Sequence, residues 1–235
     1  MLFNDNRQCR DAAFAFADLV RQAREPSAAV AGSMSIIRSD ASRRPRRSLR
    51  DSYVVLVQRF TLTTDRLVLR PFAPADVDDV LKYASDEEFG RYVPSVPNPY
   101  ERPHAEAFVA AAVASDWARN PQFAIVLDGR VIGGTEFAVD EAQTASLGYG
   151  IGRAWWGCGL ATETARAVMT CAFATYDVAV MCATADARNA ASRRVLEKVG
   201  MRLDGTLRQR RIHRGERLDE CHYSILRAEW DSAPT

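Results

Sequence analysis

The strongest constraint in this sequence is a pair of glycines, Gly157 and Gly159, that separates a strand-like segment from a helix-like one. Residues 145–151 form the strand-like segment, and small apolar residues recur at helical spacing over 161–172. A helix that begins directly after such glycines offers backbone N–H groups without partners, together with the positive end of its dipole. Strand, glycine turn and helix in this order predict a site where backbone amides hold a phosphate group.

Three interpretations of this loop differ in the ligand that they imply. A P-loop needs a lysine after its last glycine, and here Leu160-Ala161-Thr162 follows Gly159, so a P-loop is excluded. A dinucleotide-binding turn would use Gly148, Gly150 and Gly152, although these glycines lie within the predicted strand. A tight turn that binds nothing is the third interpretation.

A second helix is predicted from Asn189 to a stop at Gly200, with apolar residues recurring every fourth position. Asn189 and Ser192 lie three residues apart and therefore share a face near its N-terminus. Residues 178–185, between the two helices, form a β-rich run that suits a central strand.

Strand, glycine loop, helix, strand and an Asn-headed helix together resemble the GNAT superfamily of acetyl-CoA-dependent N-acetyltransferases. The resemblance covers residues 62–230 and is greatest for the branch that acts on ribosomal-protein N-termini and its small-molecule relatives. Three segments carry it: residues 65–72 as a first strand, residues 156–163 as the pyrophosphate loop, and residues 189–201. It implies an α/β fold with a mixed, mostly antiparallel sheet, splayed at the cofactor site, and helices on both faces.

The patterning of the remaining elements agrees with a mixed sheet covered on both faces. Asp128-Gly129 between two apolar runs predicts a hairpin with a short turn. The expected elements are a strand over 67–70, a helix from Pro74, a loop over 87–100, a helix over 103–117, and strands over 123–127 and 130–139.

The resemblance also implies which residues would bind acetyl-CoA. Pantetheine would hydrogen-bond along the splayed strand end at Tyr149, Gly150 and Ile151, where an amide would stabilise the developing oxyanion. Asn189 and Ser192 would face pantetheine. The pyrophosphate would be held by the loop around Ala154, Gly157, Cys158, Gly159, Leu160 and Ala161.

This chain departs from the family at the positions that move protons. Leu196 stands where many members have the tyrosine that protonates the thiolate. Ser192 therefore becomes the candidate acid. The alternative interpretation of Ser192 is a helix serine whose hydroxyl bonds its own backbone. Ser146 stands where the ribosomal branch has a glutamate. Glu136 is the replacement candidate for the base, against the alternative of a strand-surface carboxylate. Cys158 replaces a common lysine or arginine, so a direct salt link to phosphate is lost.

Composition excludes several other classes of protein. A net charge of +1 argues against a general attraction to nucleic acid, and no apolar run is long enough to span a membrane. Five scattered cysteines without CxxC spacing argue against a disulfide framework or a metal site and favour a cytoplasmic protein. The three histidines are isolated and predict surface or structural roles. The scarcity of lysine among the basic residues indicates a GC-rich bacterial genome.

Residues 1–58 differ from the rest and are interpreted as an extension in front of an acetyltransferase domain at 59–235. Residues 9–24 could form a short amphipathic helix, and an arginine-rich stretch follows at 38–50. Asp11 and Asp18 argue against a secretory signal. A disordered tail, a start codon assigned too early and an arm that binds nucleic acid are the three alternatives.

The function expected from the sequence is acetyl transfer from acetyl-CoA to a primary amine, by direct attack within a ternary complex in a monomer or homodimer. The acceptor would be a protein N-terminus or a small molecule, bound between residues 89–100 and the late hairpin at 213–219. Arginines 208, 210, 211 and 214 would favour an acidic acceptor. The alternative is a non-catalytic CoA-binding module with an arginine-rich arm for nucleic acid.

Overall fold

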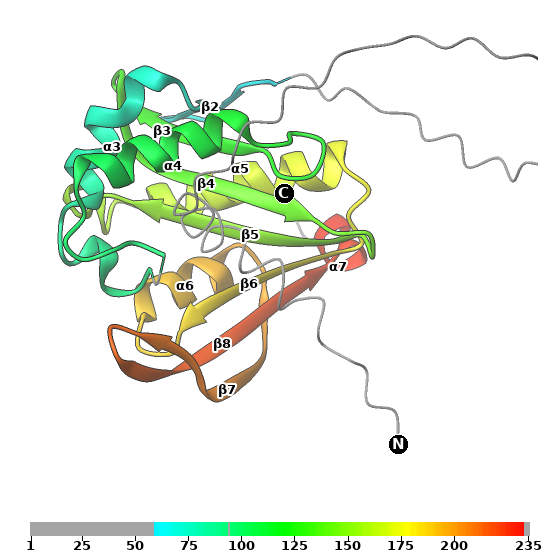
Figure 1. The fold of residues 1–235 in the computed structure, drawn as a ribbon. Helices are drawn as coiled ribbons and strands as arrows, with labels where there is room; N and C mark the ends of the chain where they lie inside the picture. Colours follow the sequence, from blue (N-terminus) through cyan, green and yellow to red (C-terminus); the bar gives the residue numbers. More distant parts are fainter. Residues whose placement is uncertain (1–58, 94, 233–235) are drawn as a thin grey trace, which may run out of the picture.

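A single twisted sheet organises the part of the chain that the computed structural model describes, residues 59–93 and 95–232 (Figure 1). The sheet has eight strands in the order β1-β2-β3-β4-β5-β6-β8-β7, and helices cover both of its faces. All neighbouring strands are antiparallel except β5 and β6, which are parallel. The mixed, mostly antiparallel α/β fold predicted from the sequence is confirmed. The predicted extension over residues 1–58, with its helix at 9–24, lies outside the described residues.

The elements follow one another along the chain with short connections. The strands are β1 (Leu62–Thr63), β2 (Val68–Pro71), β3 (Gln122–Leu127), β4 (Arg130–Val139), β5 (Thr144–Ile151), β6 (Val180–Asp186), β7 (Arg202–His213) and β8 (Glu216–Leu226). The α-helices are α3 (Val77–Ala84), α4 (Arg102–Ala114), α5 (Leu160–Thr175), α6 (Ala190–Lys198) and α7 (Arg227–Asp231), and single 3-10 turns are η1 (Pro74–Asp76), η2 (Phe89–Arg91) and η3 (Arg153–Trp155). None of these helices is both long enough and apolar enough to cross a bilayer.

The hairpin between β3 and β4 contains a bulge, which determines to which face of the sheet the later β4 side chains point. Asp128 and Gly129 form its turn with positive φ angles of 49° and 77°, as the Asp-Gly pair predicts. Val126 pairs with Val131, but Ile125 pairs with Gly133, so Ile132 is an extra residue in β4. Because side chains alternate along a strand, this extra residue reverses which of the following β4 residues point to each face.

Strands β5 and β6 separate soon after they begin to pair. Their register runs only from Thr144 opposite Val180 to Ser146 opposite Cys182. Beyond that point β5 stays paired with β4 as far as Ile151, whereas β6 stays paired with β8 as far as Asp186. A wedge therefore opens between the C-terminal halves of the two parallel strands, as expected for the splayed sheet.

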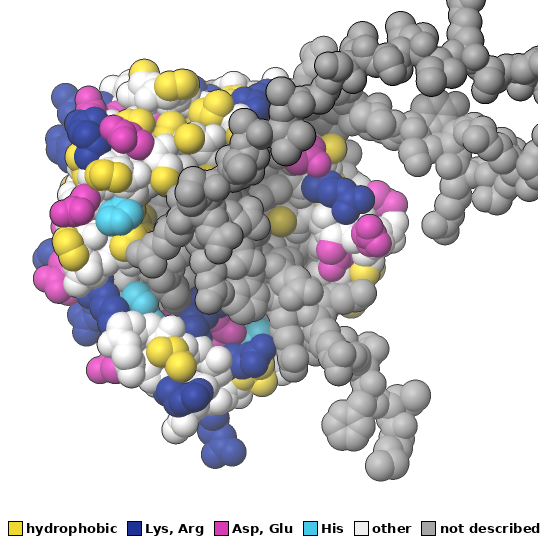
Figure 2. All heavy atoms as spheres, in the orientation of Figure 1, with side chains coloured by type: hydrophobic (Ala, Val, Ile, Leu, Met, Phe, Trp, Pro, Cys, Tyr) yellow, Lys and Arg dark blue, Asp and Glu magenta, His cyan; other side chains and the backbone are white. Residues whose placement is uncertain are grey.

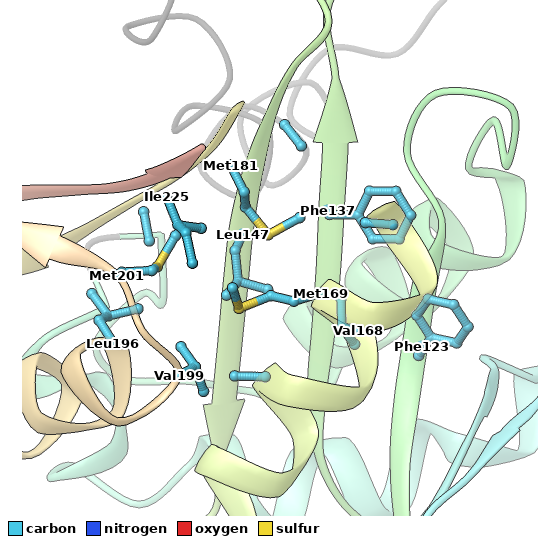
Figure 3. Close-up of a cluster of buried hydrophobic side chains, with 14 of the residues drawn as sticks. Phe123, Phe137, Leu147, Val168, Met169, Met181, Leu196, Val199, Met201 and Ile225 are labelled. Atoms are coloured by element: carbon cyan, nitrogen blue, oxygen red, sulfur yellow. The ribbon is translucent and has the colours of Figure 1, made fainter. Parts of the chain in front are cut away.

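Two clusters of apolar side chains hold the helices to opposite faces of the sheet. The larger cluster lies between the sheet and α5 and α6, where Phe137 and Met169 are fully buried (Figure 3). The smaller cluster joins α3 and α4 to the other face through Phe72 and Ala124. Strand β3 contributes to both, because Phe123 belongs to the larger cluster and its neighbour Ala124 to the smaller.

Several boundaries differ from the sequence predictions. Helix α4 ends at Ala114 rather than Trp117, because the indole of Trp117 packs on Phe123 in the cluster on the other face of the sheet. The predicted loop over 87–100 contains the 3-10 turn η2, and β6 begins at Val180 rather than at residue 178. The two-residue strand β1 was not predicted, since it is too short to show alternation.

Truncation of Phe137 should destabilise the domain strongly. Its side chain has no exposed surface, and its ring packs edge-on against Tyr176 at 4.8 Å between centroids. Phe137→Ala removes these contacts and leaves a cavity, so we expect the free energy of unfolding to fall by about 3–5 kcal/mol. Urea unfolding followed by circular dichroism measures the change. Ile212→Ala, at a side chain that is 59% exposed, is the control and should change stability by less than about 0.5 kcal/mol.

Candidate active site

The glycine loop ends in a helix N-terminus that is open to solvent. Gly157 and Gly159 have φ angles of 75° and 78°, a left-handed conformation that favours glycine. Gly159 is the N-cap of α5, which begins at Leu160, and no side chain caps the helix. The first amides of α5 are therefore available to an anion.

A network of hydrogen bonds from the turn between β1 and β2 holds the start of α5. The Glu163 carboxylate accepts from the Thr64 hydroxyl at 2.6 Å, from the Arg66 backbone N–H at 3.0 Å and from Arg66 Nε at 2.7 Å. Burial alone would raise the pKa of Glu163, but these bonds from Thr64 and Arg66 hold the pKa below its usual value. Glu163 thus stays ionised and ties α5 to the start of β2.

Arg66 links the turn between β1 and β2 to the glycine loop, and its guanidinium forms an ion pair with Glu163. Its Nη1 donates to the Cys158 carbonyl at 2.9 Å, and its side chain remains 48% exposed. Sequence analysis missed this residue, because Cys158 was expected to leave the loop without a cation. The only sequence signal was an arginine at the start of the family's first strand, about ninety residues from the loop.

The wedge between β5 and β6 is bridged by a contact between two hydroxyl groups. Tyr149 Oη lies 2.9 Å from Ser192 Oγ on the first turn of α6, and the Asn189 side chain caps that helix by accepting from Ser192 N at 3.1 Å. Burial raises the pKa of Tyr149 to about 12, although the bond to Ser192 lowers it in part, so the phenol is protonated at neutral pH. Leu196, one turn later, is buried in the larger cluster.

Glu136 is a buried carboxylate and not a group on the strand surface. The residue is 7% exposed, and its Oε2 has no hydrogen-bond partner among the described residues. Burial raises the pKa of Glu136 to about 7, because the charged form is poorly solvated. Gly148 lies directly opposite on β5, and a Cβ there would come within 3.3 Å of the Glu136 side chain. The absence of a side chain at Gly148 leaves room beside the carboxylate.

One cavity of about 610 Å³ connects these features through the wedge. It brings together Glu136, Tyr149, Gly150, Asn189 and Ser192, all predicted as site residues. Its remaining walls include Phe89 and Tyr92 on one side and the β7–β8 hairpin on the other, where the sequence placed the acceptor. The predicted pyrophosphate-loop residues from Ala154 to Ala161 do not line this cavity; they follow the C-terminal end of β5.

Two arginines near the cavity lie close to carboxylates. Arg211 forms an ion pair with Glu220, and Arg214 lies 3.9 Å from Glu87. Figure 2 shows basic and acidic side chains interspersed over the part of the visible face that is not grey. Two of the four arginines that the sequence suggested for an acidic acceptor, Arg211 and Arg214, thus have carboxylates close by, and a preference for such an acceptor stays a prediction.

The histidines have structural partners. His213 is buried with Nε2 3.1 Å from the Gly90 carbonyl, and His104 Nδ1 accepts from the Glu101 N–H at 3.0 Å. His222 Nε2 lies 3.1 Å from a Glu220 oxygen in the cavity wall. Among residues 59–93 and 95–232, no cluster of three or more metal-ligating side chains exists.

Comparison with known proteins assigns this chain to a family. The Acetyltransferase (GNAT) domain matches residues 66–202, and the chain belongs to this family of acetyltransferases. An uncharacterised N-acetyltransferase of Bacillus subtilis (strain 168), YnaD, is 28% identical over 173 residues, which cover 72% of this chain and 99% of the relative.

Solved structures agree with this assignment. A GNAT-family acetyltransferase from Bacillus anthracis has a TM-score of 0.65 and 26% identity, and the match covers 72% of this chain and 99% of that one. RimL, a ribosomal L7/L12 α-N-protein acetyltransferase solved with coenzyme A, has a TM-score of 0.64 over 69% of this chain and 95% of its own. At 17% identity, RimL shows the shared fold alone.

Replacement of Gly159 should weaken coenzyme A binding more than it weakens the fold. Gly159→Ala strains a residue at φ 78° and tilts the first amides of α5, so we expect the Kd for coenzyme A to rise about tenfold or more. Isothermal titration calorimetry measures the Kd. Gly129→Ala is the matched control, because Gly129 has φ 77° and open space around it but lies in the β3–β4 turn. Equal effects of the two substitutions on Kd would contradict a role for the loop.

Proposed function

We propose that this chain transfers an acetyl group from acetyl-CoA to a primary amine by direct attack within a ternary complex. The observation that carries the proposal is a buried carboxylate, Glu136, beside the strand edge that no longer pairs with β6, in one cavity with the hydroxyls of Tyr149 and Ser192. Membership of the GNAT acetyltransferases supports the reaction class.

The donor would lie along the wedge with its phosphates at the glycine loop. Backbone groups of Tyr149, Gly150 and Ile151 would pair with pantetheine as an additional strand would, because this part of β5 no longer pairs with β6. An amide of this edge would stabilise the oxyanion that forms at the thioester carbonyl. The N-terminus of α5, with Arg66 beside it, would hold the pyrophosphate. The coenzyme A bound to RimL supports this choice of donor.

Glu136 would remove the proton from the attacking amine. A base with a pKa of about 7 is ionised in part at neutral pH and still accepts a proton readily. Its position opposite Gly148 puts the carboxylate next to the strand edge where the thioester would lie. No ion pair neutralises Glu136 among the described residues.

Ser192 would protonate the departing thiolate. Its hydroxyl contacts Tyr149 Oη, and the tyrosine keeps its own proton at neutral pH. Tyr149 can therefore orient the serine hydroxyl by sharing a hydrogen bond with it. This pair of hydroxyls would take the role of the tyrosine that the family places at Leu196.

The acceptor would be a protein N-terminal α-amine or a small-molecule amine, and we propose a cytoplasmic enzyme related to the ribosomal branch. A non-catalytic CoA-binding module is the second candidate, on the observation that the family's usual acid and base positions hold Leu196 and Ser146. Acetyl transfer is preferred because the cavity supplies Glu136 and Ser192 in their place.

Release of thiol from acetyl-CoA in the presence of amines tests the function. We expect release that depends on the amine when the protein is offered a panel of N-terminal peptides and small amines. Gly157→Glu is the inactive control, because a carboxylate in the exposed loop would repel the pyrophosphate. Coenzyme A binding without release for any amine would favour the non-catalytic module, and absence of binding would contradict both candidates.

Loss of the Glu136 carboxylate should lower kcat and remove the acid limb of the pH profile. Because burial raises the pKa of Glu136 to about 7, the base becomes protonated as the pH falls through about 7, and kcat/KM calculated for the neutral amine should fall about tenfold per unit below it. Glu136→Gln should reduce kcat roughly 100- to 10,000-fold. Glu141→Gln, at a side chain that is 88% exposed, is the control. A Glu136→Gln variant that retains both rate and pH profile would show that another group is the base.

A further inference from the structure

Two buried polar atoms, on residues that line the cavity, lack hydrogen-bond partners among the described residues. They are Nε2 of Gln122 and Oε2 of Glu136, on residues that are only 3% and 7% exposed. Both residues line the cavity. A buried polar group without a partner is costly, so such a group beside a cavity points to a ligand that completes it.

The register of the sheet places the two groups in one row that leads to the wedge. Gln122 is opposite Glu136, and Glu136 is opposite Gly148, so the three residues lie side by side on β3, β4 and β5. Directly opposed residues point to the same face, and neighbouring strands lie about 4.8 Å apart. The amide is therefore one strand further from the wedge than the carboxylate.

The hydrogen-bonding capacities of Gln122 and Glu136 define the ligand that would satisfy both groups. A glutamine Nε2 only donates hydrogen bonds, and an ionised carboxylate only accepts them. A complementary ligand has a donor over β4 and an acceptor over β3, a short distance apart. An amine whose neighbouring carbon carries a carbonyl group has this pattern, with its nitrogen on Glu136 and its carbonyl oxygen on Gln122.

This orientation also suits the proposed reaction. The nitrogen would lie beside Gly148, where no side chain blocks its approach to the wedge, and the carbonyl would point away from the thioester. The side of the cavity that holds Phe72 and Phe108 would receive the remainder of the acceptor. A lysine side chain or a polyamine has no such carbonyl and would leave the Gln122 amide without a partner.

We propose that Gln122 is a specificity-determining residue that recognises the carbonyl group next to the attacking amine, so that the enzyme selects α-amino amides, including peptide N-termini, over alkylamines. This inference rests on the proposed acetyl transfer and specifies its acceptor class. The pKa of Glu136, the proposed base, agrees with this acceptor class. A pKa of about 7 for Glu136 lies close to that of an α-amine, about 8, and about three units below that of lysine.

A matched pair of small amines tests the proposal. Alaninamide and 2-aminobutane share the branched carbon that carries the amine and differ in whether an amide or an ethyl group follows. Rates are compared as kcat/KM for the neutral form of each amine, which removes the effect of their different basicities. We expect the unchanged protein to prefer alaninamide by roughly 10- to 100-fold, the effect of one buried hydrogen bond left unmade.

Gln122→Met removes the amide while keeping a side chain of similar length. It should abolish the preference by lowering kcat/KM for alaninamide to the level of 2-aminobutane, while the Kd for coenzyme A stays unchanged. If that variant does not fold, Gln122→Asn withdraws the amide by one carbon and should also lose most of the preference.

Three results would overturn the proposal. Equal use of the two amines by the unchanged protein would show that no carbonyl is recognised. An equal loss for both amines in the Gln122 variants would assign Gln122 a purely structural role. Release of thiol with alkylamines alone would leave acetyl transfer standing and refute this specificity, whereas no release with any amine would refute the acetyl transfer on which it rests.

Discussion

The candidate site depends on the separation of β5 from β6 after only three paired residues. Each strand is held elsewhere, β5 by β4 and β6 by β8, so the wedge between them does not close. The same separation exposes a backbone edge, lets the cavity pass through the sheet, and places the N-terminus of α6 across the gap from Tyr149. Ligand groups from the two faces of the sheet can meet at this opening.

Much of the architecture could be predicted because it is encoded locally. The Asp-Gly turn, the glycine loop before α5 and the stop of α6 at Gly200 each depend on a few adjacent residues with special backbone preferences. The roles of Tyr149, Asn189 and the loop remain predictions, although the structure gathers the first two at one cavity. The end of α4 could not be predicted, because it depends on the packing of Trp117 against a distant residue, Phe123.

The environment of individual polar groups was the least predictable feature. Glu136 has the sequence context of an exposed strand carboxylate, yet the neighbouring strands bury it and change its acidity. Arg66 reaches the glycine loop only because Glu163 holds it there, a contact between residues 97 positions apart. No sequence pattern indicated Gln122, because its proposed role depends on Glu136, which lies opposite it on the neighbouring strand.

The extra residue in β4 determines which β4 side chain stands opposite Gln122. Were Ile132 paired in regular register, Gln122 would stand opposite Thr135, and the row that leads to the wedge would carry a hydroxyl in place of a carboxylate. The Gly152 amide donates to the Ile132 carbonyl at 2.8 Å, which continues the β4–β5 register, so Ile132 is an extra residue on the β3 side alone. The one extra residue between the turn and Glu136 thus determines whether a carboxylate or a hydroxyl stands beside Gln122 in this row.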